Sequence, residues 1–265
     1  MPQTENKKAL IVVRTYPTPA RKGAEVSCTA AITEDGHWLR LFPVPWRYLP
    51  TDQQFRKYEW VDLTVEKAFS DPRPESYKLK QNGIKIIFYL DVDSEWNARK
   101  QTILPLRSHC LCCLTRQRDA NGFPTLGIFR PRKIERLLIL ADKPNWTAAQ
   151  QAILSQGHLF AEKPHKPLEK IPFKFMYKFW CDDGACKSHT LSCTDWEMAE
   201  SWRKWSAKYG KEWEAKFRLR FEKEMIEKYD TYFYVGTVHQ HPNRWLIVGL
   251  FHPPKSTKGE LLFAP

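Results

Sequence analysis

The sequence predicts an α+β fold: a β-rich N-terminal third that forms a small barrel or a curled sheet, then mixed strands, two C-terminal helices and a closing hairpin. Short β-branched runs recur through the first 95 residues, which is typical of strands. Apolar residues recur at three- and four-residue spacing from 195 to 229, which is typical of helices packed on a core. Helices between strands are too few for a doubly wound parallel sheet.

Length and composition place the chain among globular proteins. Its 265 residues, 42% of them hydrophobic, are enough for one large or two small domains with a buried core. We expect a barrel-like part over residues 1–95 and an α+β part with a Cys/His cluster over residues 96–265. One continuous domain is the alternative.

The first third contains four predicted strands. A β-branched run over residues 8–16 ends at two prolines, and the segments 26–33 and 37–44 flank the turn sequence Glu34-Asp35-Gly36. This pattern predicts a hairpin. Alternation over residues 60–67 predicts the fourth strand, and the whole is typical of a small barrel or curled sheet.

The middle of the chain mixes strands and helices. A strand is predicted over residues 84–92, and a helical segment from 96 to about 118 is broken by Pro105. Residues 126–140 are basic first and apolar after, as expected of a short segment that enters a strand. A helix over 146–156 and a strand over 173–180 follow.

The C-terminal third predicts two helices, 195–209 and 211–229, separated by Gly210. Their apolar stripe belongs to the core, and their other face carries balanced charges, as a solvated face does. The segments 231–239 and 245–251 then form a hairpin around a turn at residues 241–243.

The charge of the chain points to a polyanionic partner, most simply nucleic acid and by preference DNA. The net charge is +12, and residues 96–140 carry nine Lys and Arg against two acids. Eleven Trp also suit stacking on bases. We expect the main nucleic-acid contacts from the basic residues of this segment: Arg99, Lys100, Arg107, Arg130, Arg132 and Lys133. Further candidate contacts lie in the first third of the chain: Arg21, Lys22, Arg40 and Arg47.

Cysteine usage predicts a reducing compartment, and we expect a cytoplasmic protein. The seven cysteines are an odd number, and the polar N-terminal sequence is not followed by an apolar segment typical of a signal peptide. No apolar run approaches the length of a membrane span, so no membrane partner is expected. The sequence leaves the oligomeric state open.

A Cys/His cluster predicts a metal site. Cys181, Cys186, His189 and Cys193 lie within thirteen residues, and zinc takes four thiolate and imidazole ligands. Four protein ligands leave no position for water, so we expect one structural zinc. The alternative is that these cysteines are small buried residues beside an ordinary turn. The cysteines at 110, 112 and 113 fit a helix face in the core, or supply a further ligand.

Two carboxylates follow the cluster. Asp195 is the first candidate for a catalytic carboxylate and Glu197 the second, with Asp71 and Glu75 in the proline-held loop 71–77 as outside candidates. A structural interpretation competes, because the sequence Thr194 to Glu197 has the pattern of a capping box with Thr194 as the N-cap. In either case we expect the helix N-terminus to keep Asp195 ionised.

Several enzyme classes are excluded by missing motifs. The sequence has no GxxxxGK[ST], GxGxxG, HExxH or GxSxG pattern. This excludes P-loop NTPases, dinucleotide enzymes, zincins and α/β-hydrolases, and we expect no nucleotide cofactor.

Six segments together resemble a family of bacterial proteins of nearly this length, mostly uncharacterised. They are VRTYPTP, SCTAAITEDGHWLRLFPVPWR, DPRPESY, LGIFRPRKI, the cysteine stretch leading into DWE, and YFYVGTVHQHPNRWLIVGLFHPPK. A narrower resemblance is to anti-phage DNA glycosylases that remove a glucosylated cytosine from viral DNA. The G-Q-D-P-Y and H-P-S-P motifs of uracil glycosylases are absent. The resemblance therefore implies an activity but assigns no catalytic residue.

Three hypotheses follow for function. The first is a DNA glycosylase that excises a modified base, which needs a carboxylate, an aromatic pocket and a basic surface. The second is a module that reads modified bases or structured RNA without chemistry. The third is a metal-dependent nuclease, which needs clustered acids.

Overall fold

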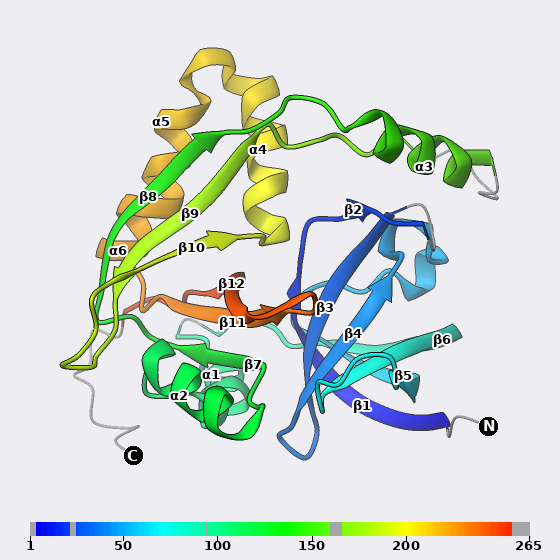
Figure 1. Cartoon of the computed structure of the whole chain (residues 1–265), viewed down its shortest axis with the longest axis horizontal. Coiled ribbons are helices and arrows are strands. Elements are labelled where there is room, and N and C mark those ends of the chain that lie inside the picture. Colours follow the sequence, from blue (N-terminus) through cyan, green and yellow to red (C-terminus); the bar gives the residue numbers. More distant parts are fainter. Residues whose placement is uncertain (1–3, 22–24, 94, 160–165, 256–265) are drawn as a thin grey trace.

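The computed structural model describes residues 4–21, 25–93, 95–159 and 166–255, and it is built on two six-stranded sheets (Figure 1). The α+β class predicted from the sequence is confirmed. One sheet lies in the N-terminal part and the other in the C-terminal part; most helices lie beside the second sheet, whereas α3 reaches toward β2 of the first (Figure 1).

The first sheet closes into a barrel of five strands, with order β1-β5-β6-β4-β3 and a further pairing of β1 with β3. Alternating apolar residues, among them Leu39, Leu41, Val61 and Leu63, fill its interior. The expected hairpin is confirmed as β3–β4. The strands are β1 (Thr4–Arg14), β2 (Thr18–Pro19, paired to β3), β3 (Glu25–Thr33), β4 (Trp38–Val44), β5 (Glu59–Lys67) and β6 (Ser76–Tyr89).

The second sheet has the order β7-β11-β12-β10-β9-β8. Its pairings are antiparallel except for β10–β12, which is parallel and joined at Cys193 and Ile247. Its strands are β7 (Leu126–Phe129), β8 (Lys133–Ala141), β9 (Phe173–Trp180), β10 (His189–Cys193), β11 (Tyr232–Val238) and β12 (His241–Phe251).

Helices α1 and α2 are separated as Pro105 predicted, since α1 ends at Ile103 and a short 3-10 turn holds the proline. The α-helices are α1 (Asn97–Ile103), α2 (Leu111–Asn121), α3 (Ala148–Leu159), α4 (Trp196–Tyr209), α5 (Trp213–Arg218) and α6 (Glu224–Glu227). Short 3-10 turns are η1 (Trp46–Tyr48), η2 (Thr51–Gln53), η3 (Leu104–Leu106) and η4 (Gly210–Glu212), and a π-helical turn, η5 (Leu219–Lys223), joins α5 to α6.

Helices α4 to α6 cover one face of β8 and β9 (Figure 1). The rings of Phe175 and Phe217 stack at 4.6 Å between centroids, and Tyr177 Oη donates to the carbonyl oxygen of Phe221 at 2.6 Å. The aromatic stripe predicted from the helical spacing is therefore core.

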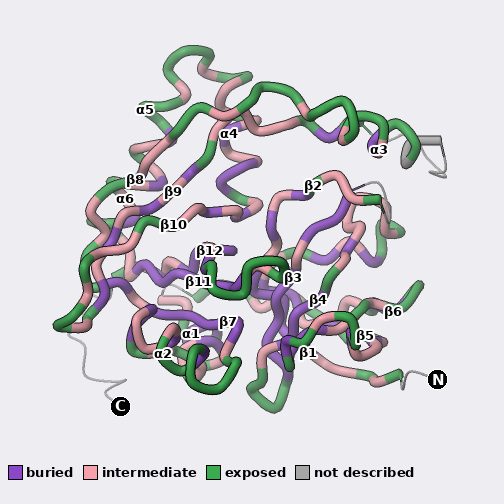
Figure 2. The backbone as a smooth tube through the Cα atoms, in the orientation of Figure 1, coloured by how far each residue is buried: buried purple, intermediate pink, exposed green. Residues whose placement is uncertain are grey.

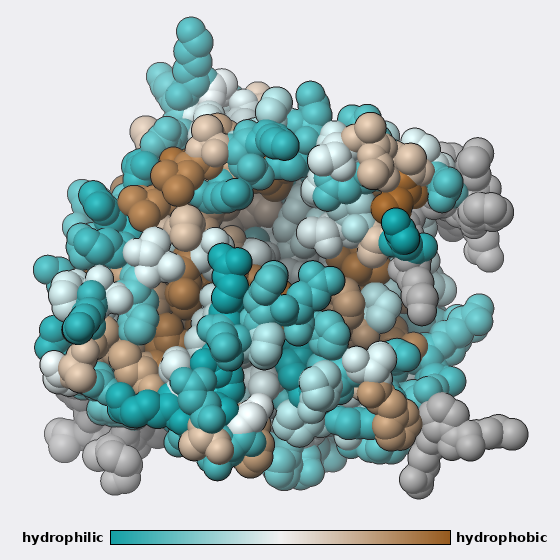
Figure 3. Space-filling view, viewed as in Figure 1, coloured by the Kyte–Doolittle hydropathy of each residue, from teal (hydrophilic) through white to brown (hydrophobic). Residues whose placement is uncertain are grey.

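A shared hydrophobic cluster joins the two sheets. Val12 and Val13 of β1 belong to the same buried cluster as Ile128, Tyr234 and Phe251. Buried backbone is continuous from the barrel strands into β11 and β12 (Figure 2), whereas the face in Figure 3 is largely hydrophilic. No helix among the described residues is long and apolar enough to cross a membrane.

Four sequence predictions about element bounds were wrong. Strand β6 begins at Ser76 and passes through Asn82, which has a positive φ of 55°, so the sequence QNG marks an irregularity inside one strand. Residues 126–140 form two strands, and β10 was not expected. The closing turn lies at His239–Gln240, because β12 already begins at His241.

Candidate functional site

A cavity of about 340 Å³ lies where the ends of β1 and β6 and helix α1 meet the N-terminus of α4. Its walls combine four aromatic rings, four cations and two carboxylates: Tyr58, Tyr89, Trp96 and Trp196; Arg14, Arg56, Lys57 and Arg99; Asp195 and Glu197. Its size is within the range of small-ligand sites, and its polar groups converge on an aromatic space. Both carboxylates selected from the sequence are therefore in one cavity.

Asp195 is the N-cap of helix α4, and this corrects the predicted capping box. The Oδ1 atom of Asp195 accepts from the backbone N–H of Met198 at 3.1 Å. Thr194 does not cap the helix; its hydroxyl lies 3.4 Å from the carbonyl oxygen of Ile247 on β12. Asp195 is only 3% exposed, and it forms a β-bridge with Thr15, so its position is fixed both by the helix it caps and by the segment after β1.

The pKa of Asp195 is raised to about 6, mainly by burial and then by the negative charge of Glu197. The helix N-terminus favours the ionised form, but here burial outweighs it. Burial therefore opposes the effect of the helix N-terminus, and the Asp195 pKa lies nearer to neutral pH than the ordinary value of a carboxyl.

Glu197 forms an ion pair with Lys57, which lines the same cavity. Lys57 Nζ lies 3.2 Å from Glu197 Oε2 and donates to the carbonyl oxygen of Leu250 at 2.7 Å. Partial removal from water opposes ionisation of Glu197, but Lys57, together with His252 and Arg220, outweighs it, and the pKa of Glu197 is lowered. Likewise burial opposes the charge on Lys57, but Glu197 raises the Lys57 pKa above its ordinary value.

The accessibility of the two carboxylates differs. The Glu197 side chain is 47% exposed while lining the cavity, and the Lys57 side chain is 12% exposed. Glu197 can therefore contact a ligand directly, whereas Asp195 is enclosed. The two carboxyl pKa values are pushed apart by their environments, which is a common arrangement for an acid–base pair.

Arg14 lies between two indole rings. Its guanidinium carbon is 3.7 Å from the centroid of Trp46 and 3.9 Å from that of Trp196, which follows Asp195 in the chain. Burial lowers the pKa of Arg14 to about 10, so the group stays charged at neutral pH. A stacked arginine of this kind is held rigidly and offers its edge to an anion.

Arg99 also faces aromatic rings inside the molecule. It is 2% exposed, lies 3.9 Å from the ring centroid of Tyr58, and donates to the Tyr89 hydroxyl at 2.8 Å and to the carbonyl oxygen of Leu90. Trp96 lies beside it at 4.8 Å. Arg99 thus belongs to the cavity and not to an open basic surface.

Four of the predicted basic residues lie together in a hollow of about 550 Å³: Arg107, Arg130, Arg132 and Lys133. His109 and Lys255 line it too, and Asp182 lies at its edge. Arg130 is paired with Asp230 at 2.7 Å. The hollow concentrates positive charge beside the Cys/His cluster, as a phosphate-binding surface requires.

The other predicted basic residues are scattered. Arg40 is 2% exposed and bonds Glu75 at 3.1 Å and the carbonyl oxygen of Thr125 at 2.8 Å, and Lys100 is 8% exposed, so both are interior residues here. Arg47 is paired with Glu25. Arg21 is exposed, and Lys22 lies outside the described residues.

The outside candidates Asp71 and Glu75 lie away from the cavity. Asp71 is paired with Arg73 at 2.6 Å, and Glu75 is paired with Arg40. Burial opposes the ionisation of Asp71, but hydrogen bonds from Arg73 hold the Asp71 pKa well below its usual range. Asp71 is therefore paired within the loop, and Glu75 joins the loop to β4 of the barrel through Arg40.

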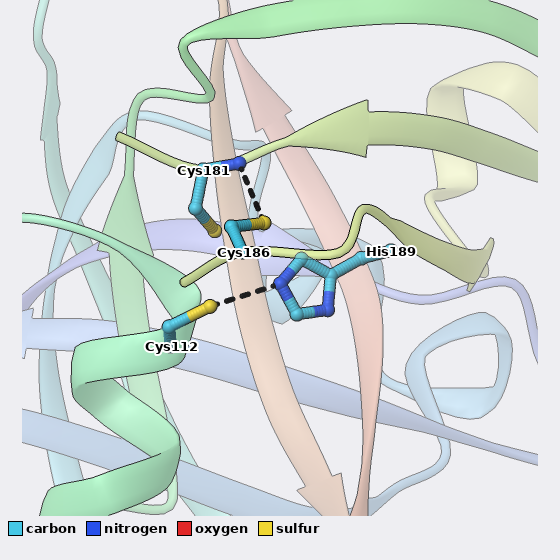
Figure 4. A group of neighbouring side chains, drawn as sticks. All are labelled: Cys112, Cys181, Cys186 and His189. Atoms are coloured by element: carbon cyan, nitrogen blue, oxygen red, sulfur yellow. Dashed lines mark hydrogen bonds between the residues drawn. The ribbon is translucent and has the colours of Figure 1, made fainter. Parts of the chain in front are cut away.

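Cys112, Cys181, Cys186 and His189 could hold a metal ion, because their ligand atoms all lie within 4.8 Å of one another. Cys112 comes from α2, Cys181 follows β9, and His189 begins β10, and their side chains point toward one another (Figure 4). Cys193, the fourth predicted ligand, is buried at the far end of β10 in the main core. A second group, Cys110, Cys112 and Asp183, shares one thiol with the first.

Sequence reasoning missed Arg14 and Lys57 as site residues, and it named Cys112 only as one of three cysteines that could supply a further metal ligand. Arg14 closes a predicted strand and Lys57 precedes one, in a run of Arg, Lys and Tyr at 56–58. Charged residues at strand ends were the available signal, but spacing alone does not identify which strand ends meet.

Two family models together match almost the whole chain. The domain of unknown function DUF8757 matches residues 107–265, and the domain of unknown function DUF8758 matches residues 5–105. The chain belongs to the DUF8757 family. The cavity takes residues from both matched ranges: Arg14, Lys57 and Arg99 lie in the DUF8758 range, and Asp195 and Glu197 lie in the DUF8757 range.

Other comparisons add little to the DUF8757 match. No curated protein matches the sequence. One solved structure, described as the tetrameric p202 HIN2, aligns over 97% of this chain and 96% of its own with a TM-score of 0.31 and 7% identity. A TM-score of 0.31 is too low to indicate a common fold or function. The narrower resemblance to a modified-base glycosylase gains no support from these comparisons.

Proposed function

We propose that this protein acts on nucleic acid, and that the cavity at the start of α4 receives one extruded base and hydrolyses its N-glycosidic bond. The observation that carries the proposal is the pairing, in one aromatic cavity, of an ionised, accessible Glu197 with a buried Asp195 whose pKa is about 6. Hydrolysis of a glycosidic bond needs a carboxylate near the anomeric carbon.

Glu197 is the residue we assign to the chemistry. It accepts a proton from the attacking water, and the water oxygen bonds to the anomeric carbon. The base departs with the electrons of the broken bond and takes up a proton from solvent. Lys57 keeps Glu197 ionised before the reaction. Asp195 fixes the helix start that carries Glu197, so it is a positioning residue.

The walls of the cavity suit a flipped base. Tyr58, Tyr89, Trp96 and Trp196 offer ring faces for stacking, and base–aromatic stacking contributes about 1–3 kcal/mol per base. The indole rings of Trp46 and Trp196 hold Arg14 in place, so its guanidinium edge can bind the phosphate of the extruded nucleotide.

The basic hollow suits the rest of the nucleic acid. Arg107, Arg132 and Lys133 are exposed in it and can neutralise phosphates along a backbone. We take DNA with a modified base, for example a glucosylated cytosine, as the substrate, because the sequence resemblance implies it. All seven cysteines are free, which fits our proposal of action in the cytoplasm.

A module that reads a base without chemistry is the second candidate. The Lys57–Glu197 ion pair and the stacked Arg14 also form a rigid pocket that can bind without cleaving. The nuclease hypothesis has less support, because the groups of possible metal ligands among the described residues consist mainly of thiols and an imidazole, not paired carboxylates.

The two candidates differ in product. The protein is incubated with plain DNA and with heavily modified phage DNA, and abasic sites and free bases are measured beside a gel-shift titration. A glycosylase releases bases and leaves abasic sites in the modified DNA. A gel shift without abasic sites supports the reader, and strand breaks that require magnesium support a nuclease and contradict the proposal.

A further inference from the structure

We propose that Cys112, Cys181, Cys186 and His189 bind one zinc ion that fastens helix α2 to the loop between β9 and β10. This inference is independent of the proposed function, because it rests only on the geometry of four side chains outside the cavity. The fourth ligand comes from a helix 69 residues before Cys181 in the chain, and not from Cys193 as the spacing alone predicted.

The geometry fits a tetrahedral site. Zinc binds thiolates at about 2.3 Å and imidazole nitrogens at about 2.0–2.1 Å, so a sulfur and a nitrogen ligand on one ion lie about 3.6 Å apart. Cys112 Sγ lies 3.2 Å from His189 Nε2, and all four ligand atoms lie within 4.8 Å of one another. Bringing these ligands onto one ion therefore needs only small side-chain shifts.

The donor set indicates zinc in a structural role. Three thiols and one imidazole form the Cys₃His combination of structural zinc sites, and four protein ligands leave no position open for water. On binding, the three thiols release their protons to solvent and the imidazole binds as the neutral form. No step of this binding needs an oxidant or a reductant.

A second group of possible metal ligands lies beside the first and shares Cys112 with it. Cys110 and Asp183 form a second group with Cys112, but Asp183 is already paired with Arg116 at 2.7 Å. Cys110 Sγ lies 2.7 Å from Cys113 Sγ. That group offers three donors, two of them engaged, whereas the first group offers a complete set of four.

The proposed zinc would crosslink α2 to the loop between β9 and β10, which has no regular secondary structure of its own. Residues 181–188 form no helix or strand, and the backbone N–H of Cys181 donates to the Cys186 sulfur at 3.3 Å. Asp182 in this loop and Arg132 after β7 both line the basic hollow. The zinc therefore holds one wall of that hollow in place.

The first experiment measures the metal content of the full-length protein purified without chelator, with cobalt(II) as a spectroscopic replacement. We expect about one zinc per chain, and cobalt(II) spectra with the thiolate charge-transfer and tetrahedral ligand-field bands of a Cys₃His site. Removing the metal should lower the melting temperature. Protein with less than about a tenth of an equivalent of zinc and no cobalt(II) binding would overturn the proposal.

Variants then assign the ligands. Cys112→Ala and Cys186→Ala should each lose the zinc, while Cys110→Ala and Cys193→Ala should keep it. Cys112→His, which supplies another zinc ligand, should restore binding if Cys112→Ala fails to fold. Loss of zinc from Cys193→Ala together with full retention in Cys112→Ala would overturn this ligand set. Loss in Cys110→Ala with retention in Cys186→Ala would assign the metal to the second group instead, and so overturn it too.

Discussion

Lys57 Nζ lies 3.2 Å from Glu197 Oε2, although the two residues are 140 positions apart in the chain. Lys57 precedes a strand of the barrel, and Glu197 lies in the first turn of α4. The contact joins the two parts of the fold at the cavity. It also sets the charge of the carboxylate that we assign to the chemistry.

Glu197→Gln should abolish most of the turnover and leave binding intact. The amide keeps the shape of the side chain but cannot accept the proton of the attacking water, so we expect the single-turnover rate to fall by about a hundredfold or more. Base release and gel-shift affinity are measured on the same preparation. Glu200→Gln is the control, because Glu200 lies on the same helix and is paired with Arg203. A rate close to wild type would move the chemistry away from Glu197.

Lys57→Met should shift the pH dependence of the reaction. Lys57 lowers the pKa of Glu197, so its removal raises that pKa. Glu197 then remains protonated, and inactive, up to a higher pH, and the acid limb of the rate profile moves toward neutral pH. The single-turnover rate is followed from about pH 5 to pH 8 in both proteins. An acid limb at the same pH in both would separate the lysine from the active carboxylate.

Asp195→Asn should stabilise the protein at neutral pH. The Asp195 pKa is raised from 3.8 to about 6, so between these values the folded state holds a proton that the unfolded state has lost. The contribution of this carboxyl to stability is full below about pH 4 and is lost as the pH rises through about 6. Asparagine does not titrate and still caps a helix. Above pH 6 we expect a gain of roughly 1–3 kcal/mol in the free energy of unfolding.

Chemical denaturation of wild type and Asp195→Asn at about pH 4.5 and about pH 7.5 checks the sign. The stability difference should grow as the pH rises. A variant that is less stable than wild type at pH 7.5 would show that the ionised carboxylate is favoured in the fold, contrary to its burial. The single-turnover rate of the same variant ranks the two carboxylates, and the loss should be smaller than for Glu197→Gln.

Replacing Arg132 and Lys133 together by Ser should weaken binding to every DNA sequence alike. Each phosphate contact contributes about 0.9 to the slope of log affinity against log salt, so the slope should fall by about two. Binding is titrated across several salt concentrations. The matched control replaces Lys204 and Lys211, which are exposed on α4 and just after it, and removes the same charge from the solvated face. An equal change in both double variants would indicate a general charge effect and not a contact surface.

Local sequence patterns predicted much of the fold. The β3–β4 hairpin, the break at Pro105 and the aromatic stripe of α4 and α5 each depend on neighbouring residues, so the sequence carries them directly. The errors lie where tertiary contacts decide. Strand β10 has five residues inside the cysteine stretch and exists because β9 and β12 pair with it.

The candidate site was predicted in part. Asp195 and Glu197 stand next to a recognisable helix start, and the structure places both in the cavity. Their partners come from distant segments: Cys112 is 77 residues from His189, and Lys57 is 140 residues from Glu197. The capping residue was misplaced by one position, because Thr194 remains with β12 and helix α4 begins after Asp195.

All four cations of the cavity come from the DUF8758 range and both carboxylates from the DUF8757 range, so we expect residues of the two ranges to evolve in a coordinated way. Replacing Lys57 by an acidic residue would leave Glu197 without its positive partner, so we expect positions 57 and 197 to vary together among relatives. Neither half carries the complete constellation. Recombination that exchanges one half between distant relatives should therefore preserve both folds and lose the activity that we propose, until the matching residue in the other half is exchanged as well.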